Sequence, residues 1–460
     1  MPKRLKVFLA VLGICLLALL MPYAKPSPVR VFHQHESWPG PSQELTDLQH
    51  EGVFATHLPI LILHTDGRII PGYLRDDLAE LPCDWAVIHN ENGVNRLDGA
   101  PSQTGRLQMS IRGNSSRDYP KKQYVMKTVD ADGLPQDVSL MGMPAESSWV
   151  LNGSYINHSL IRNYMMYNLA GDVMEYAPRT RLCEVFTTNA SGEPVYQGVY
   201  TLMEKIKVSK VRLDLKDGSS KSSMHHAETP FVLQMNSYID NKRIFHLKPD
   251  GVNTYSFDLE YPDTALLTPD MAHYIEQQLL LFEKAMYDAV RTSDWDILNS
   301  LIDMDSFVNY YIVNEFVQNL DAGTRSTYLY QNMGGKMAIG PVWDFDGAFN
   351  NFADVENRVD YLKLKTTFYY RSLFQDEDFV NLCIARYHEL RRGLLSDESL
   401  LAYIDEAAAY LEQPAHRNAM RWYGGDDQLF YDDIQSMKDF VVERGAWMDE
   451  NFASLCTIVK

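Results

Sequence analysis

Residues 319–350 read N-L-D-A-G-T-R-S-T-Y-L-Y-Q-N-M-G-G-K-M-A-I-G-P-V-W-D-F-D-G-A-F-N. The β-branched and aromatic residues at 327–330 and 337–343 predict two strands, and the Asn-Met-Gly-Gly between them predicts a turn. The two ends of a hairpin lie close together. Asp321, just before the first strand, can therefore lie close to Asp344 and Asp346 at the exit of the hairpin, just after the second strand.

Clustered carboxylates repel one another unless a cation or a shared proton holds them. The hairpin therefore predicts either a catalytic metal site or a structural turn whose acids cap a helix or bind calcium. The same order of acid, hairpin and acid occurs in the centre of protein kinases, where a magnesium-binding Asp-Phe-Gly follows the hairpin. Here the exit reads Asp344-Phe345-Asp346-Gly347.

The chain of 460 residues can form one large two-lobed domain with extensions. Its 45% hydrophobic and 12% aromatic residues are ample for a large core. The net charge of −19 indicates a solvated acidic surface and argues against a nucleic-acid partner.

The N-terminus predicts a targeting segment. Lys3, Arg4 and Lys6 precede a nearly unbroken apolar run at 7–21, and the Pro-Tyr-Ala at 22–24 could end at a signal-peptidase site. The run is short for a transmembrane helix, which needs about 20 residues. A cleaved signal peptide and an uncleaved anchor therefore both remain open.

Residues 1–24 are accordingly predicted to be a signal peptide or anchor, with membrane contact only through residues 7–23. We expect residues 25–52 to be a linker whose histidines, His33 and His35 among them, are exposed to solvent. In either case the body is expected to be exported and to work outside the cytoplasm or at the cell surface.

Leu107, Met109 and Ile111 alternate with polar residues, which predicts a half-buried strand. The next five residues, Arg112-Gly113-Asn114-Ser115-Ser116, form a small turn that is rich in hydrogen-bond donors. Arg112, Asn114 and Ser115 are therefore candidates to cover nucleotide phosphates, in the manner of an anion-binding nest. An ordinary hairpin turn is the alternative.

A second strand is predicted at 121–128, where Val125 and Lys127 share a face. A small apolar residue two positions before a lysine is typical of the kinase strand whose lysine holds nucleotide phosphates. Lys127 is therefore our first choice for that role, and Lys122, on the opposite face, is the second. A solvated strand face is the alternative.

Helical spacing at 160–169 predicts a helix that carries Arg162 and Asn163 but no acid to pair with a lysine. Beyond it, strands are expected first and helices later, so the fold class is α+β. The further strands are predicted at 181–187, 195–204 and 257–261, and the helices at 271–291, 306–320, 376–395, 398–412 and 432–452.

Several of these stretches together resemble the CotH family, the spore-coat protein H kinases. The resemblance covers roughly residues 58–352 and rests on motifs that occur in the family's order. They are R-G-N-S-S at 112–116 with K-K-Q-Y at 121–124, the stretch at 159–163, G-V-Y-T-L-M-E-K at 198–205, and Asp321 followed by Y-L-Y at 328–330 and W-D-F-D at 343–346.

The resemblance implies an atypical protein-kinase-like, two-lobed fold, which we place at residues 53–390, with a C-terminal helical extension at 391–460. It also implies transfer of the ATP γ-phosphate to Ser or Thr of a surface or coat protein, or of the chain itself, with Mg²⁺ or Mn²⁺. Asp321 would be the catalytic-loop acid, and Asp344 would bind the metal. Glu204 would lie on the strand that leads to the adenine hinge.

One position departs from the family pattern. Many members have an Asn five positions after the catalytic Asp, where it binds a second magnesium ion, and this chain has Ser326. A hydroxyl can ligate magnesium, and Asn319 or Asp346 could also supply the ligand. Two alternatives to a kinase therefore remain: transfer of another part of ATP, such as AMP, and a non-catalytic surface-binding module (a pseudokinase or adhesin).

Overall fold

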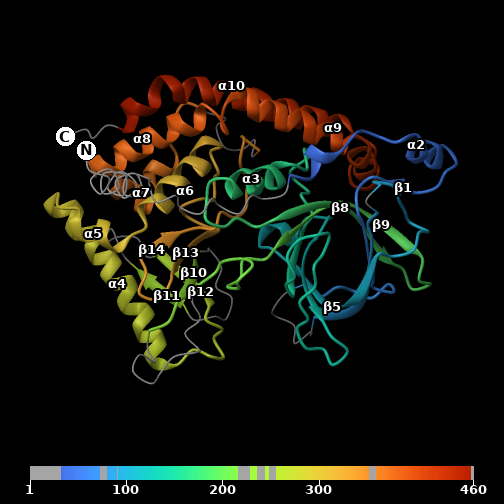
Figure 1. Cartoon of the computed structure of the whole chain (residues 1–460), viewed down its shortest axis with the longest axis horizontal. Coiled ribbons are helices and arrows are strands. Elements are labelled where there is room, and N and C mark those ends of the chain that lie inside the picture. Colours follow the sequence, from blue (N-terminus) through green and yellow to red (C-terminus); the bar gives the residue numbers. More distant parts are fainter. Residues whose placement is uncertain are drawn as a thin grey trace, which may run out of the picture.

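The computed structural model describes residues 33–72, 80–90, 92–215, 228–235, 244–247, 255–351 and 359–456. The predicted targeting segment lies outside these ranges. Within them, no helix is long and apolar enough to cross a membrane. Strands dominate the first part of the chain and helices the second, which confirms the α+β prediction (Figure 1).

The first part forms a closed β-barrel, on the right in Figure 1. Neighbouring strands are antiparallel, except that β2 and β8 pair in parallel. In order around the barrel, the strands are β2 (Ile60–His64), β3 (Leu81–Ile88), β5 (Gln103–Arg112), β6 (Gln123–Val129), β7 (Ser148–Asn152), β9 (Pro194–Glu204) and β8 (Thr180–Thr188).

The barrel is filled by alternate side chains of its strands. Leu107 and Met109 on β5 are buried in one apolar cluster with Trp85 on β3 and Met126 on β6. This alternation confirms the strand predicted around Leu107. Because the period of a strand is two, the intervening side chains point out of the barrel interior.

The segment predicted to be a linker packs against the rest of the protein. It contains η1 (Gln34–Ser37) and α2 (Gln43–His50), and it leads into β1 (Ala55–Thr56), which pairs with β4 (Asn95–Arg96). The predicted solvent exposure of His33 and His35 is wrong, since both are buried. His35 explains this for its own side chain: its ring packs edge-on against the ring of Tyr164, and its Nδ1 atom lies 2.9 Å from the Tyr164 hydroxyl.

The second part contains an antiparallel sheet in the order β11 (Ile244–Leu247), β12 (Tyr255–Tyr261), β10 (Phe231–Met235), β13 (Thr327–Gln331) and β14 (Met337–Ile339). Strands β13 and β14 form the hairpin predicted from the sequence, with Leu329 opposite Ile339.

The predicted helices are all present. The last two are longer than predicted, whereas the helix predicted at 376–395 ends at Arg391. Besides η1 and α2, the helices of the described residues are η2 (Ser115–Arg117), α3 (Arg162–Gly171), α4 (Pro269–Thr292), α5 (Asp296–Leu301), α6 (Met304–Phe316), η4 (Leu364–Thr366), α7 (Phe368–Leu373), α8 (Glu377–Arg391), α9 (Asp397–Trp422) and α10 (Gln428–Cys456).

Helix α9 continues through Pro414, although a helix was predicted only as far as residue 412. Proline has no N–H, so the carbonyl of Tyr410, one turn earlier, loses its helical partner. The Nε2 atom of His57 lies 2.7 Å from this carbonyl oxygen and satisfies it. Burial lowers the pKa of His57 to about 4, so its ring is neutral at pH 7.

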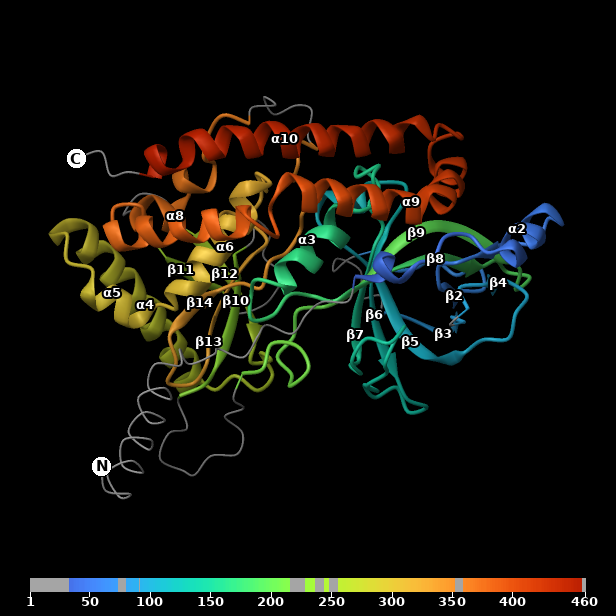
Figure 2. The same cartoon turned by 45° about the horizontal axis from the view of Figure 1, so that its top comes forward.

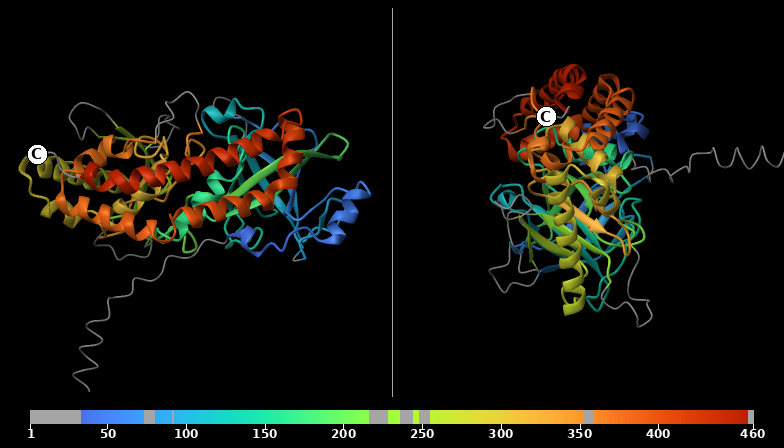
Figure 3. Two further views of the ribbon diagram at one scale, coloured as in Figure 1. Left: turned by 90° about the horizontal axis from the view of Figure 1, so that it is seen from above. Right: turned by 90° about the vertical axis from the view of Figure 1, so that its left-hand side faces the viewer.

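Helices α9 and α10 run side by side from the helical part to the barrel (Figures 2 and 3). At the barrel end, Asn418 on α9 accepts a hydrogen bond of 2.8 Å from Lys121 and one of 3.2 Å from the N–H of Val199 on β9. Gly198 has a φ of +98°, and a Cβ there would collide with Asn418. Helix α9 therefore binds the barrel through buried polar contacts.

Candidate functional site

A cleft of about 1070 Å³ lies where the barrel meets the helical part. The end of β5 and the loop after it line one side, and the segments before β13 and after β14 line the other. Predicted site residues from distant parts of the sequence thus meet here. Those that line the cleft are Arg112, Asn114, Ser115, Asp321, Ser326, Asp344 and Asp346.

Helix α3 fixes the segment that carries the exit acids. The N–H of Asp344 donates to the hydroxyl of Tyr167 at 3.0 Å. Asn163 accepts from the N–H of Phe345 and donates to the Asp346 carboxylate, both at 2.8 Å. The predicted helix at 160–169 therefore supplies an amide and a hydroxyl to this site.

Asp346 is surrounded by amide side chains. Besides Asn163, the amide nitrogens of Asn152 and Asn157 each lie 3.4 Å from its carboxylate oxygens. These donors favour the charged carboxylate, but burial outweighs them and raises the pKa of Asp346 above its usual value.

Asp344 is the more perturbed acid. Burial, then the charge of Asp346, then that of Asp321, raise its pKa to about 7, and Arg112 opposes these effects. Its φ of +63° is also uncommon for a residue other than glycine. A cation that enters the site stabilises the charged form of a carboxyl group held in this way.

Asp321 lies in a short turn after α6. The N–H of Arg325 donates to its carbonyl oxygen at 2.7 Å, and the Arg325 guanidinium lies 3.8 Å from its carboxylate. Ser326 follows with a φ of +47° and leads directly into β13. Both Asp321 and Ser326 line the cleft, as predicted.

Asn319 does not line the cleft, although it was predicted as a possible metal ligand. Its amide nitrogen donates to the carbonyl oxygen of Asp344 and to the side chain of Asn314, each at 3.0 Å, and its amide oxygen lies 3.4 Å from the N–H of Asp321. Asn319 therefore links the two acid-bearing segments, and this structural role uses the groups that a metal would need.

The loop after β5 presents its predicted residues to the cleft. The Arg112 guanidinium lies over the Trp343 ring, 5.5 Å from its centroid, and donates to Gln123 at 2.8 Å. Gly113 has a φ of +109°, and a Cβ there would overlap the Ser116 hydroxyl. Only glycine therefore allows the tight turn that brings the following residues over the cleft.

The two predicted phosphate lysines do not line the cleft. The strand phase was correct, because Val125 on the same face as Lys127 does line it. The Lys127 ammonium, however, lies 2.6 Å from the carboxylate of Glu80 at the rim, and Lys122 donates to the carbonyl of Arg117. Among the described residues, the cations that line the cleft are Arg112, Arg117, Lys205 and Arg325.

Glu204, predicted near an adenine hinge, also points away from the cleft. Its carboxylate is fully buried, accepts from Tyr176 at 3.1 Å and pairs with Arg179 at 2.8 Å. The flanking residues Met203 and Lys205 line the cleft instead. The end of β9 therefore lies beside the cleft, but the alternation of side chains along the strand turns Glu204 to the other face.

The acids fit a metal that is bound together with phosphates. Within the described residues, no group of three or more His, Cys, Asp or Glu is placed to hold a metal ion. Mg²⁺ commonly keeps several waters and binds through one or two carboxylates plus substrate phosphates. Asp344 and Asp346, with Arg112 facing them, match this requirement.

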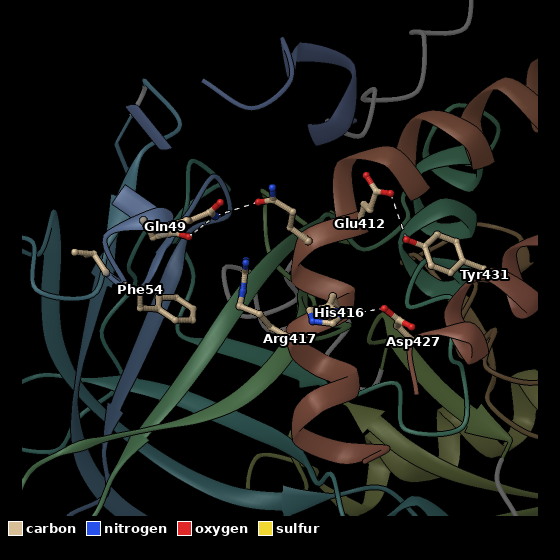
Figure 4. Close-up of a pocket in the computed structure, with 11 residues that line it drawn as sticks. Gln49, Phe54, Glu412, His416, Arg417, Asp427 and Tyr431 are labelled. Atoms are coloured by element: carbon tan, nitrogen blue, oxygen red, sulfur yellow. Dashed lines mark hydrogen bonds and ion pairs between the residues drawn. The ribbon is translucent and has the colours of Figure 1, made fainter. Parts of the chain in front are cut away.

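A second pocket, of about 620 Å³, lies between the α2–β1 region and α9 (Figure 4). Its polar side chains already pair with one another: His416 lies 2.9 Å from Asp427, and Tyr431 donates to Glu412 at 3.3 Å. Arg417 pairs with the buried Glu184 at 2.7 Å. The acid-lined cleft is therefore the stronger candidate for chemistry.

The chain matches the family model of the CotH kinase protein over residues 109–448. This match covers most of the chain and includes Asp321, Asp344 and Asp346 of the cleft. The chain therefore belongs to the CotH kinase family, which confirms the resemblance seen in the sequence, and family membership indicates a kinase-like protein. No curated protein matches the chain.

Proposed function

We propose that this protein is a metal-dependent kinase that transfers the γ-phosphate of ATP to a Ser or Thr hydroxyl of a protein. One observation carries the proposal. Asp321 lines the same cleft as Asp344 and Asp346, and this clustering helps to raise the pKa of Asp344 to about 7. The arrangement is unfavourable without a cation and suits one that arrives with phosphates.

Four charged residues of the cleft have roles in this mechanism. Asp344 and Asp346 hold Mg²⁺ or Mn²⁺, which neutralises charge on the phosphates when bound. Arg112 supplies a fixed positive charge, the role that the sequence suggested for Lys127. Asp321 orients the acceptor hydroxyl and accepts its proton late. Most of the rate enhancement then comes from positioning and from electrostatics in a partly buried site.

The arrangement of the two parts supports a kinase-like, two-lobed fold. In this proposal the barrel is the first lobe, and the loop that follows β5 covers the phosphates with Asn114 and Ser115. Met203 and Lys205, at the end of β9, lie where the chain leaves the barrel and line the cleft. They are suited to contact the base of the nucleotide.

The place of action is a separate proposal. The basic and apolar pattern of residues 1–24 supports export, either with a cleaved signal peptide or with an anchor. The substrate would then be a surface or coat protein, or the chain itself.

The test is incubation of the purified protein with ATP and Mg²⁺ or Mn²⁺, with the label on the γ-phosphate in one sample and on the α-phosphate in another. We expect transfer of the γ-label to the protein, and loss of this transfer in Asp321→Asn. Transfer of the α-label would instead indicate AMP transfer. Absence of both labels under every metal would contradict the enzyme proposal.

A non-catalytic binding module is the second candidate, and Ser326 is the observation that favours it. A neutral hydroxyl is a weaker ligand for a hard cation than the amide oxygen that many family members have at this position. Metal-dependent nucleotide binding without transfer would support this candidate.

A further inference from the structure

The segment at 359–367 returns to the loop that carries Asp321. The ammonium of Lys363 donates to the carbonyl oxygen of Asn319 at 3.2 Å. On the other side of the turn, Gly323 lies so close to Thr367 that a Cβ at 323 would be 2.7 Å from the threonine hydroxyl. The two segments are therefore in direct contact around Asp321.

A buried ion pair fixes the backbone of Lys363. Its N–H donates to Glu315 on α6 at 2.8 Å, and the N–H of Leu364 donates to the other carboxylate oxygen at 2.6 Å. Arg444 on α10 pairs with Glu315 at 2.8 Å and donates to the carbonyl of Tyr361, also at 2.8 Å. The position of Lys363 is thus set by two helices.

The Lys363 side chain is partly buried among charged groups. Burial lowers the pKa of the Lys363 ammonium to about 8; the carboxylates of Asp321 and Glu315 oppose this shift, and Arg325 adds to it. Asp321 has the larger effect of the two acids. Lys363 is not among the residues that line the cleft, so a role for it in the reaction would be indirect.

We propose that Lys363 is a positioning residue for Asp321, which holds the catalytic loop through Asn319 and offsets the negative charge of the Asp321 carboxylate. This inference rests on the proposed kinase function. During transfer, negative phosphoryl oxygens and the acceptor hydroxyl come close to Asp321. A fixed cation near the carboxylate reduces the repulsion between them, and it does so in the transition state more than in the bound ATP complex.

Three substitutions separate charge from hydrogen bonding. Lys363→Arg keeps both the charge and a donor, Lys363→Gln keeps a donor alone, and Lys363→Met removes both. We expect the Gln and Met variants to lose about tenfold or more in kcat, with KM for ATP within about threefold of the unaltered protein, and Arg to restore most of the loss. Lys365→Gln, on the same segment, is the matched control and should be unchanged.

The outcomes are distinct. If Lys363→Gln retains full kcat, a charge at this position is not needed and the inference is wrong. If Lys363→Arg is as inactive as Lys363→Gln, or if KM for ATP rises as much as kcat falls, the role is one of packing and the inference is also wrong. If the unaltered protein transfers no label under any metal, the proposed function itself fails, which the Lys363 variants alone would not show.

Discussion

Asp344 carries two unfavourable features in the metal-free protein. Its backbone is in the left-handed region, and its carboxyl group is partly buried beside Asp346. Such features persist where the surrounding structure imposes them, and they gather at functional sites. Tyr167 and Asn163 impose them here, through their hydrogen bonds to the backbone of this segment.

Asp344→Asn is expected to raise the melting temperature of the metal-free protein and to abolish its stabilisation by Mg²⁺ with nucleotide. The pKa of Asp344 is raised to about 7 in the folded state, whereas an unfolded Asp titrates near about 3.9. The folded state therefore binds more protons between these values, and the contribution of Asp344 to stability falls as the pH rises through this range.

The gain from Asp344→Asn should consequently be larger at pH 8 than at pH 5. Thermal unfolding at the two pH values measures it, and Asn tolerates the left-handed backbone, so the comparison isolates the charge. Equal gains at both pH values would show that the carboxyl group is not held in the perturbed state described here.

Arg112→Gln is expected to weaken ATP binding by about tenfold, more than Lys127→Gln does. Arg112 lines the cleft and acts on both exit acids, whereas Lys127 is 46% exposed and pairs with Glu80. Binding titrations with Mg²⁺ present measure the difference, with Lys122→Gln as the control. A larger loss for Lys127→Gln would return the phosphate role to the lysine chosen from the sequence.

Ser326→Asn is expected to keep the protein stable and to leave transfer unchanged or raise it. The φ of +47° at this position is one that Asn adopts more readily than most residues. An amide oxygen is also the better ligand for a hard cation, and the effect should fall on turnover. A large loss of labelling, with unchanged thermal unfolding, would mean that Ser326 has its own role.

At the scale of elements, α6 and α10 are joined by the fully buried pair of Glu315 and Arg444. Glu315 also holds the segment of Lys363, so one carboxylate connects two helices with the loop beside the cleft. Removing one partner of such a pair leaves a buried charge without compensation.

Arg444→Met is therefore expected to lower the free energy of unfolding by about 3 kcal/mol. Urea unfolding measures this. The double variant Glu315→Gln with Arg444→Met should recover part of the loss, because no buried charge then remains. A single variant as stable as the unaltered protein would show that the pair contributes little.

For the whole molecule, the question is whether α9 and α10 form an extension or part of the fold. The family match runs to residue 448, inside α10. The buried ammonium of Lys121 depends on Asn418 of α9, and α9 and α10 lie along both parts of the molecule (Figure 2).

A chain that ends at residue 395 is accordingly expected not to fold. It would expose the apolar surface covered by α9 and α10, and it would leave Lys121 and Glu184 without Asn418 and Arg417. Soluble expression and circular dichroism test this. A folded, nucleotide-binding truncated chain would support the boundary that was placed at residue 390 from the sequence.

The local sequence determined much of this protein. The hairpin at 327–339, the strand around Leu107 and the helices of the second part follow from periodicity and turn residues, which act between near neighbours. The family motifs also located the acids that line the cleft. Strand alternation even predicted the shared face of Val125 and Lys127.

Only the tertiary structure decided which polar groups serve the site. Asn163 reaches Asp346 across 183 positions of the chain, and Lys363 reaches Asn319 across 44. The periodicity of the sequence predicts whether a side chain is buried, but not which side chain it contacts. Lys127 and Glu204 lie on the predicted strands and yet pair with Glu80 and Arg179, because long-range packing brings these partners within hydrogen-bonding distance.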